Sequence, residues 1–141
     1  MARAERTEIM QANAEDIFNV LKDYESYSEF MEGVASVEVL ERDGNKVQAK
    51  YNINMIKKFS YIINLVEEAP NKLSWTLDSG DLFTKNIGEW LLKDLGDGTT
   101  EVTYSLDVEL KLMVPKMISK KLVSTSLPAM MKSVENRAIN G

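Results

Sequence analysis

The sequence predicts one α+β domain in which a curved, seven-stranded antiparallel β-sheet wraps around a long C-terminal helix, with two short helices after the first strand. Three observations support this fold class. Apolar and polar residues alternate with a period of two through the middle of the chain, as expected for strands with one covered face. Helical spacing marks residues 13–33 and the segment after Pro115. The length of 141 residues suits a single domain with a sizeable core.

The N-terminal part is expected to form a strand and then the two short helices. Residues 3–11 make the first strand, and their weak apolar–polar alternation does not show which side chains point inward. Asn13 is placed to cap the first helix, because its side chain can accept a hydrogen bond from a first-turn backbone N–H. Residues 26–29 fit a capping box for the second helix, and Gly33 suits its C-terminal end. The first helix carries an apolar stripe at Ile17, Val20, Leu21 and Tyr24.

About six antiparallel strands are expected to follow. Alternation is clearest in residues 101–112, and it recurs in residues 47–55 and 73–78. The covered face of the clearest strand would contain Val102, Tyr104, Leu106, Val108, Leu110 and Leu112. Turn-forming residues separate the alternating runs at hairpin spacing, at positions 43–45, 69–71, 79–81 and 96–98.

A long helix is expected to begin at Pro115, since a proline in the first turn loses no hydrogen bond. Pro128 falls inside this helix and should kink or split it. One helix about 10–12 Å across cannot fill the concavity of a seven-stranded sheet. The two short helices can close only one end. The sequence therefore favours a hollow between sheet and helix.

Composition excludes several classes of function. The chain has no histidine and no cysteine, which removes the commonest general base, the commonest metal ligand and any thiol nucleophile. We expect no metal and no cofactor. The net charge of −5 disfavours nucleic-acid binding, because phosphate backbones repel an acidic protein. No apolar run is long enough to cross a bilayer, and residues 1–10 carry charges where a signal peptide needs an apolar stretch, so we expect a cytoplasmic protein.

Three local patterns resemble a known family. They are YESYSEFMEGV at residues 24–34, GDLFTKNIGEWLL at residues 80–92 followed by GDGTTEVTYSLDVEL at residues 96–110, and SLPAMMKSVE at residues 126–135. With the order of elements, they resemble the helix-grip fold of the START and birch-pollen-allergen (SRPBCC) superfamily. The closest resemblance is to its polyketide cyclase/dehydrase and coenzyme-Q-binding-protein branch. Members hold a lipid-like molecule between sheet and terminal helix, so the resemblance implies a ligand such as an isoprenoid quinone or a polyketide chain.

The strand within residues 80–92 can be phased in two ways. In the phase that the resemblance favours, the inward residues are Thr84, Asn86, Gly88, Trp90 and Leu92. In the other phase, Phe83, Ile87 and Leu91 face inward. That phase would bury the charges of Lys85 and Glu89, and each buried charge needs a partner. The first phase makes this strand a mostly apolar cavity wall with a polar group at Asn86.

The expected ligand-binding residues have an inward phase on a strand or lie on an apolar face of a helix. They are Tyr27, Phe30, Met31, Tyr51, Ile53, Met55, Tyr61, Trp75, Leu77, Asn86, Trp90, Tyr104, Leu106, Val108, Met117, Ile118, Leu122 and Thr125. Taken alone, each of them fits an ordinary core better than a ligand site, because aromatic and methionine stripes more often form cores. The expected partner is a hydrophobic small molecule or lipid.

We assign no catalytic residue. The acids of the predicted strands face outward or lie in turns, and a serine triad needs a histidine. A cyclase or dehydratase acting through tyrosine hydroxyls and Asn86 is the alternative, although no arginine has the clear inward phase that such relatives often use. A domain that regulates another protein is a further alternative.

Lysines cluster near the start of the terminal helix. Residues 110–134 contain five of the 17 basic residues and no acidic residue, so the rest of the chain has 12 basic and 22 acidic residues. One interpretation is a solvated helix face. The other is a site that contacts an anionic membrane, where apolar side chains lie among Lys111, Lys116, Lys120 and Lys121.

Overall fold

The computed structural model describes residues 2–55, 57–120 and 127–140. Its strands are β1 (Ala2–Met10), β2 (Val34–Asp43), β3 (Lys46–Met55), β4 (Lys57–Glu68), β5 (Lys72–Gly80), β6 (Phe83–Asp94) and β7 (Thr100–Leu110). Its helices are α1 (Ala14–Leu21), the short 3₁₀ helix η1 (Tyr24–Glu29), α2 (Lys116–Lys120) and α3 (Leu127–Asn140). No helix among these described residues is long and apolar enough to cross a membrane.

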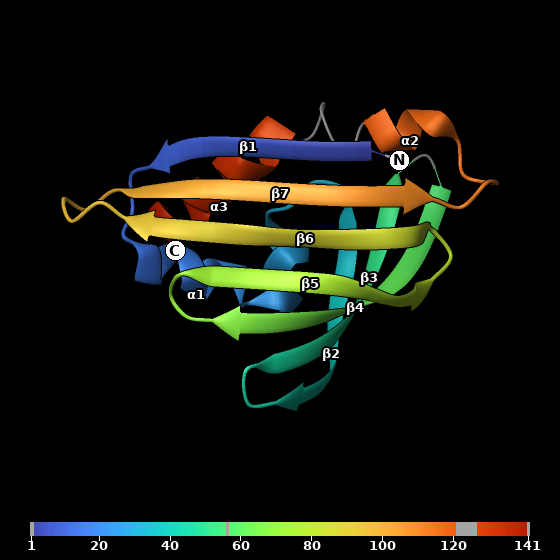
Figure 1. Ribbon diagram of the computed structural model, residues 1–141, viewed down its shortest axis with the longest axis horizontal. Helices are drawn as coiled ribbons and strands as arrows, with labels where there is room; N and C mark the ends of the chain where they lie inside the picture. Colours follow the sequence, from blue (N-terminus) through green and yellow to red (C-terminus); the bar gives the residue numbers. More distant parts are fainter. Residues whose placement is uncertain (1, 56, 121–126, 141) are drawn as a thin grey trace.

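The seven strands form one antiparallel sheet in the order β1-β7-β6-β5-β4-β3-β2. The chain leaves β1, crosses through α1 and η1 to the far edge at β2, and then returns strand by strand to β7. Figure 1 shows β5, β6, β7 and β1 side by side, with β2 and β3 turned behind them and α1 and α3 on the same inner side. The predicted fold class is confirmed.

The inner face of the sheet carries the core. Inward residues alternate along β7, where Val102, Tyr104, Leu106 and Val108 are all buried, as their spacing predicts. Helices α1 and α3 pack against each other beneath the sheet. The Asn13 side chain caps α1 by accepting a hydrogen bond of 2.8 Å from the backbone N–H of Asp16, as expected.

The second short helix differs from its prediction. It is a 3₁₀ helix that begins at Tyr24, and Ser26 lies inside it, where its N–H donates to the Asp23 carbonyl. Residues three apart eclipse in a 3₁₀ helix, so this form buries both Tyr24 and Tyr27 on one side. An α-helix capped at Ser26 would have left Tyr24 outside the helix. The expected stop at Gly33 was too late, because the helix ends at Glu29; Gly33, with a φ of 86°, lies in the turn that leads into β2.

The C-terminal helix is present in two described segments. Pro115 directly precedes α2, and Pro128 lies in the first turn of α3. The buried residues of α3 include Leu127, Met131 and Val134, as their spacing predicts. The strand prediction for residues 101–112 was too long by two residues. Lys111 leaves the ladder because its N–H donates to the Leu82 carbonyl, and Leu112 lies fully exposed beyond it.

A polar cluster joins η1 to the end of β4. The Tyr24 hydroxyl donates to Glu67 Oε2 at 2.7 Å, and the Arg42 guanidinium donates to both carboxylate oxygens at 3.0 and 3.2 Å. Burial alone would raise the pKa of Glu67. The hydrogen bonds from Arg42 and Tyr24 outweigh burial, and they hold this pKa below its ordinary value of 4.5.

Candidate functional site

A cavity of about 220 Å³ lies between the inner face of the sheet, the loop from η1 to β2, and α3. The sheet contributes most of the wall, through Tyr51, Ile53, Tyr61, Ile63, Leu65, Leu73, Trp75, Phe83, Asn86, Trp90, Tyr104 and Leu106. The start of β2 adds Val34, and the loop and helices add Tyr27, Phe30, Met31, Glu32, Gly33, Leu127, Ala129, Met130 and Ser133. The site is therefore closed by segments from both halves of the chain.

Aromatic rings form two groups on the cavity wall. On one side Tyr51 and Tyr61 stack at 5.3 Å between centroids, and Phe83 meets Tyr61 edge-on at 5.0 Å. On the other side Trp90 meets Tyr104 edge-on at 4.7 Å. Such contacts add to the stability from area burial and hold the rings in fixed positions. A planar apolar molecule in the cavity would meet preformed aromatic surfaces.

Asn86 is the polar residue at the centre of this apolar wall, and it is only 4% exposed. Its Oδ1 accepts a hydrogen bond of 3.0 Å from the indole N–H of Trp75. An indole nitrogen can only donate, so this bond fixes the orientation of the amide. The Nδ2 group has no partner among the described residues, yet it is not sealed from solvent. The amide N–H₂ therefore faces the cavity as an available donor.

Gly88 allows the indole of Trp75 to lie against β6. The two residues are paired across strands β5 and β6. A Cβ atom at position 88 would lie 2.3 Å from the Cζ2 atom of Trp75 and 2.9 Å from the Ser105 carbonyl oxygen. Both distances are far inside normal contact, so this position requires glycine for steric reasons. Gly88 thus places the Trp75 N–H where Asn86 can accept from it.

Tyrosine hydroxyls supply further polar groups. The Tyr27 hydroxyl donates to the Leu21 carbonyl. Within the described chain, the hydroxyls of Tyr61 and Tyr104 have no hydrogen-bond partner, and neither is sealed from solvent. Burial raises the pKa of both Tyr61 and Tyr104 well above its usual value. These hydroxyls stay protonated at neutral pH, so they can donate hydrogen bonds but are poor general bases.

A contact between the end of η1 and α3 joins two segments of the cavity wall. The Arg137 guanidinium lies over the Phe30 ring at 5.2 Å and donates to Glu29 at 2.8 Å. Phe30 and Ser133 border the cavity, and Ser133 lies one turn before Arg137 in α3. This contact therefore fixes the position of α3 relative to the loop that follows η1.

The structure brings most of the predicted ligand-binding residues to this one cavity. Those that line it are Tyr27, Phe30, Met31, Tyr51, Ile53, Tyr61, Trp75, Asn86, Trp90, Tyr104 and Leu106. Val108 and Ile118 are fully buried away from it, and Leu77 packs against the core. Met117 points to solvent instead and is 63% exposed. Leu122, Thr125 and Lys121, together with the side chain of Met55, lie outside what the structure describes.

The strand prediction for residues 80–92 was wrong at its start. Asn86, Gly88, Trp90 and Leu92 are buried as expected, but Thr84 faces outward and Phe83 faces inward. A register shift between positions 83 and 85 inserts one extra residue and reverses the phase there. Uniform alternation could not reveal this bulge, and Phe83 was therefore missed. Leu73 could have been included, because it shares the inward phase of Trp75.

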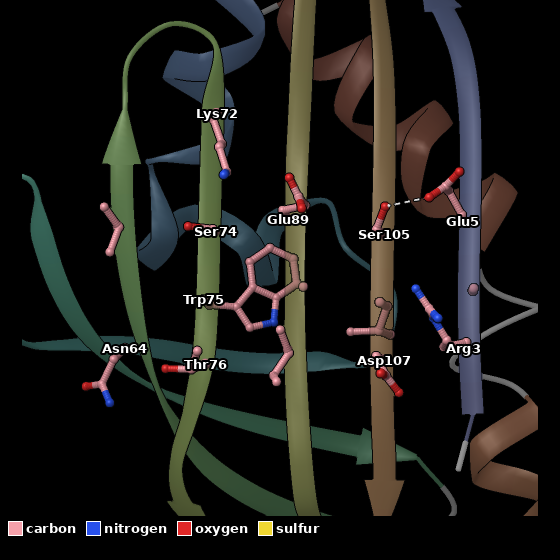
Figure 2. A pocket seen from close by; sticks show the side chains of 15 residues that line it. Arg3, Glu5, Asn64, Lys72, Ser74, Trp75, Thr76, Glu89, Ser105 and Asp107 are labelled. Atoms are coloured by element: carbon pink, nitrogen blue, oxygen red, sulfur yellow. Dashed lines mark hydrogen bonds between the residues drawn. The ribbon is translucent and has the colours of Figure 1, made fainter.

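Figure 2 shows a second hollow, of about 610 Å³, on the outer face of the sheet. It crosses β5, β6, β7 and β1 and carries charges of both signs. Here the Ser105 hydroxyl donates to Glu5 at 3.2 Å, and Lys85 pairs with Asp107 at 2.9 Å. We assign the functional site to the inner cavity, because that cavity is more apolar and more enclosed than the outer hollow and is lined by oriented donors.

Across the described parts of the chain, no group of three or more acidic side chains could hold a metal ion. The donors that face the cavity are amide and phenol groups, which suit an uncharged organic ligand.

Comparison with known proteins agrees with this architecture. The family model described as "Polyketide cyclase / dehydrase and lipid transport" matches residues 10–135. A START superfamily protein from Mycobacterium smegmatis is 26% identical, with a TM-score of 0.85 over 99% of this chain and 98% of that one. No curated protein sequence gives a match.

Two more distant structures share the fold alone. The Zhui aromatase/cyclase from Streptomyces sp. R1128 is 14% identical, with a TM-score of 0.82 over 97% of this chain and 93% of that one. Human STARD10 is 17% identical, with a TM-score of 0.82 over 97% of this chain and 63% of that one. The family match spans nearly the whole domain, and the fold is that of its members. The chain therefore belongs to the polyketide cyclase/dehydrase and lipid transport family within the START superfamily.

Proposed function

We propose that this protein binds a hydrophobic small molecule or lipid that carries a carbonyl-type acceptor, an isoprenoid quinone being one candidate. The observation that carries the proposal is the pairing of an aromatic cavity with the oriented amide of Asn86. The apolar body of the ligand would lie against the stacked rings, and its acceptor would meet the Asn86 N–H₂ group. The protonated hydroxyls of Tyr61 and Tyr104 offer two more donors.

The energetic cost of an empty cavity supports a binding role. At about 24 cal/mol per Å³, a dry apolar void of 220 Å³ would cost at most about 5 kcal/mol. That is a large share of the ~5–15 kcal/mol by which a domain is stable. Binding a ligand only in the folded state would recover stability, and the gain would grow with the logarithm of the ligand concentration.

The cavity also limits the size of the bound part. Ligand sites usually measure roughly 300–1,000 Å³, and this cavity of 220 Å³ is smaller. A molecule of one or two rings, or the headgroup of a longer lipid, would fill it. A longer tail would have to leave between the η1–β2 loop and α3, which form the wall that is not part of the sheet.

Organic extraction of the purified protein, followed by mass spectrometry, tests the proposal directly. We expect a co-purifying compound with an apolar body and at least one carbonyl. Calorimetric titration with 2-methyl-1,4-naphthoquinone and with 2-methylnaphthalene, a matched pair with and without carbonyls, tests the role of the donors. Tighter binding of the quinone supports the proposal. Failure to bind either probe, together with an extract without lipid, would refute it.

The second candidate is a cyclase or dehydratase of polyketide-like substrates. The donors around the cavity favour it to the extent that they could polarise a substrate carbonyl. The raised pKa of Tyr61 and Tyr104 argues against it, since a neutral phenol does not abstract a proton from carbon at neutral pH. Incubation with a poly-β-keto thioester distinguishes the two candidates, because a carrier would leave the product distribution unchanged.

A further inference from the structure

The loop between β7 and α2 presents an apolar tip to solvent. Leu112 is 103% exposed, Met113 is 92% exposed, and Met117 in α2 is 63% exposed. Lys111 directly precedes Leu112, Lys116 directly precedes Met117, and both lysines are exposed. We call these five residues the basic apolar tip. Such complete exposure of adjacent large apolar side chains is unusual on a protein surface and indicates a contact site.

The tip is held in place by the fold. Its loop makes three backbone hydrogen bonds, from Lys111 N to Leu82 O at 3.0 Å, from Val114 N to Lys111 O at 3.0 Å, and from Ile118 N to Pro115 O at 3.1 Å. Val114 and Ile118 are buried and anchor the segment on both sides of Met117. The exposed side chains therefore project from an anchored base.

The charge around the tip is positive, whereas the rest of the molecule is acidic. Residues 110–134 contain five lysines and no acid, in a chain with a net charge of −5. Lys57 and Lys58, at the start of β4, are also exposed at this end. Lys120 extends the basic surface along α2. Asp81 directly precedes Leu82, the residue whose carbonyl accepts from Lys111. The Asp81 carboxylate already accepts a hydrogen bond of 2.9 Å from the Ser60 N–H.

Backbone hydrogen bonds connect the segments around the tip to segments that line the cavity. Figure 1 shows α2, the end of β7 and the start of β4 at the same end of the molecule. Asp81 N donates to Ser60 O at 3.0 Å, which ties the start of β4 to the turn that holds the tip. Asn54 N donates to Gly33 O at 2.8 Å, which ties the end of β3 to the cavity-lining loop after η1.

We propose that the basic apolar tip docks the protein on an anionic lipid surface. Leu112 and Met113 would insert among the acyl chains while the lysines meet the lipid headgroups. The apolar side chains match the acyl-chain layer of such a surface, and the surrounding lysines match its anionic headgroup layer. A symmetric contact between two copies fits poorly, because it would bring the lysines of both tips together. Docking does not depend on which molecule the cavity holds.

Sedimentation with vesicles tests the proposal. We expect the protein to bind vesicles of phosphatidylcholine with phosphatidylglycerol, to bind pure phosphatidylcholine much more weakly, and to lose affinity as salt rises. Each lysine contributes about a fivefold factor near such a surface, so Lys111→Gln with Lys116→Gln should weaken binding about 25-fold. Leu112→Ser with Met113→Ser should weaken it more than tenfold, because the apolar insertion is lost.

A control lies at the opposite end of the sheet, at the end of β6 and in the β6–β7 turn. Lys93→Gln with Leu95→Ser removes one exposed cation and one apolar side chain that is 42% exposed, and it should leave binding unchanged. Thermal melting of all variants should match the parent, since every altered side chain is exposed. No binding of the parent to anionic vesicles would overturn the proposal. So would equal losses in tip and control variants, or concentration-dependent dimers that disappear with Leu112→Ser.

Discussion

Replacement of Asn86 by leucine separates its role in ligand recognition from its role in the fold. Leucine has a similar size, so the wall keeps its shape, but the Trp75 N–H loses its acceptor and the cavity loses its donor. An unpaired buried donor costs about 1–3 kcal/mol. We therefore expect the free energy of unfolding in urea to fall by about that amount.

The same substitution in a Trp75→Phe background gives the control. Phenylalanine has no N–H group, so Asn86→Leu should cost close to nothing there. The double-mutant cycle should therefore yield a coupling energy of about 1–3 kcal/mol between positions 75 and 86. Equal destabilisation in both backgrounds would show that the observed hydrogen bond does not hold the amide in place.

The ligand assay addresses recognition. Loss of one neutral hydrogen bond is worth about 1 kcal/mol, or roughly fivefold in affinity. Calorimetry should show about this loss for 2-methyl-1,4-naphthoquinone with Asn86→Leu, and no loss for 2-methylnaphthalene, which has no acceptor. A similar change for both compounds would refute the idea that the amide recognises a carbonyl. It would instead point to a change in cavity shape.

Three further outcomes are expected. Gly88→Ala should destabilise the fold by about 1–3 kcal/mol in urea melts, because its Cβ would lie 2.3 Å from Trp75; a neutral effect would contradict the close approach. The pKa of Glu67 is lower in the folded than in the unfolded chain, so its stabilising effect is present above about pH 4.5 and is lost as pH falls through the folded pKa. Glu67→Gln should therefore flatten the acid limb of stability against pH, and an unchanged limb would exclude this pairing as its cause. Arg137→Ala should cost no more than about 1 kcal/mol but speed ligand release in stopped-flow experiments, since its contact with Phe30 holds α3 to the opposite wall; unchanged release would show that the ligand leaves elsewhere.

Strand phase could be predicted wherever the alternation was uninterrupted. The inward residues of β7 follow directly from their spacing. In β6 the spacing allowed two phases, and the family resemblance favoured the one that places Asn86 and Trp90 inward. The predicted orientations of Thr84 and Phe83 were reversed, because a bulge adds one residue to β6 without any signal in the hydrophobic pattern. Period-two reasoning therefore predicts most of the cavity wall and fails at its irregular edge.

Features that depend on tertiary contacts could not be predicted from the pattern. The hydrogen bond between Trp75 and Asn86 joins neighbouring strands, and its geometry depends on the missing side chain of Gly88. The contribution of α3 to the cavity depends on how the helix is placed over the sheet. The exposure of Leu112 reflects the end of β7, where the backbone pairs with Leu82 instead of continuing the ladder.

Trp75 and Trp90 are the two tryptophans of this chain, and both border the cavity. The intrinsic indole fluorescence of the protein therefore originates entirely from the walls of its candidate site. A quinone entering the cavity would quench this emission on contact, whereas a saturated acyl chain would shift it toward the blue by excluding water. Occupancy and the polarity of the occupant can thus be followed optically in the unmodified protein.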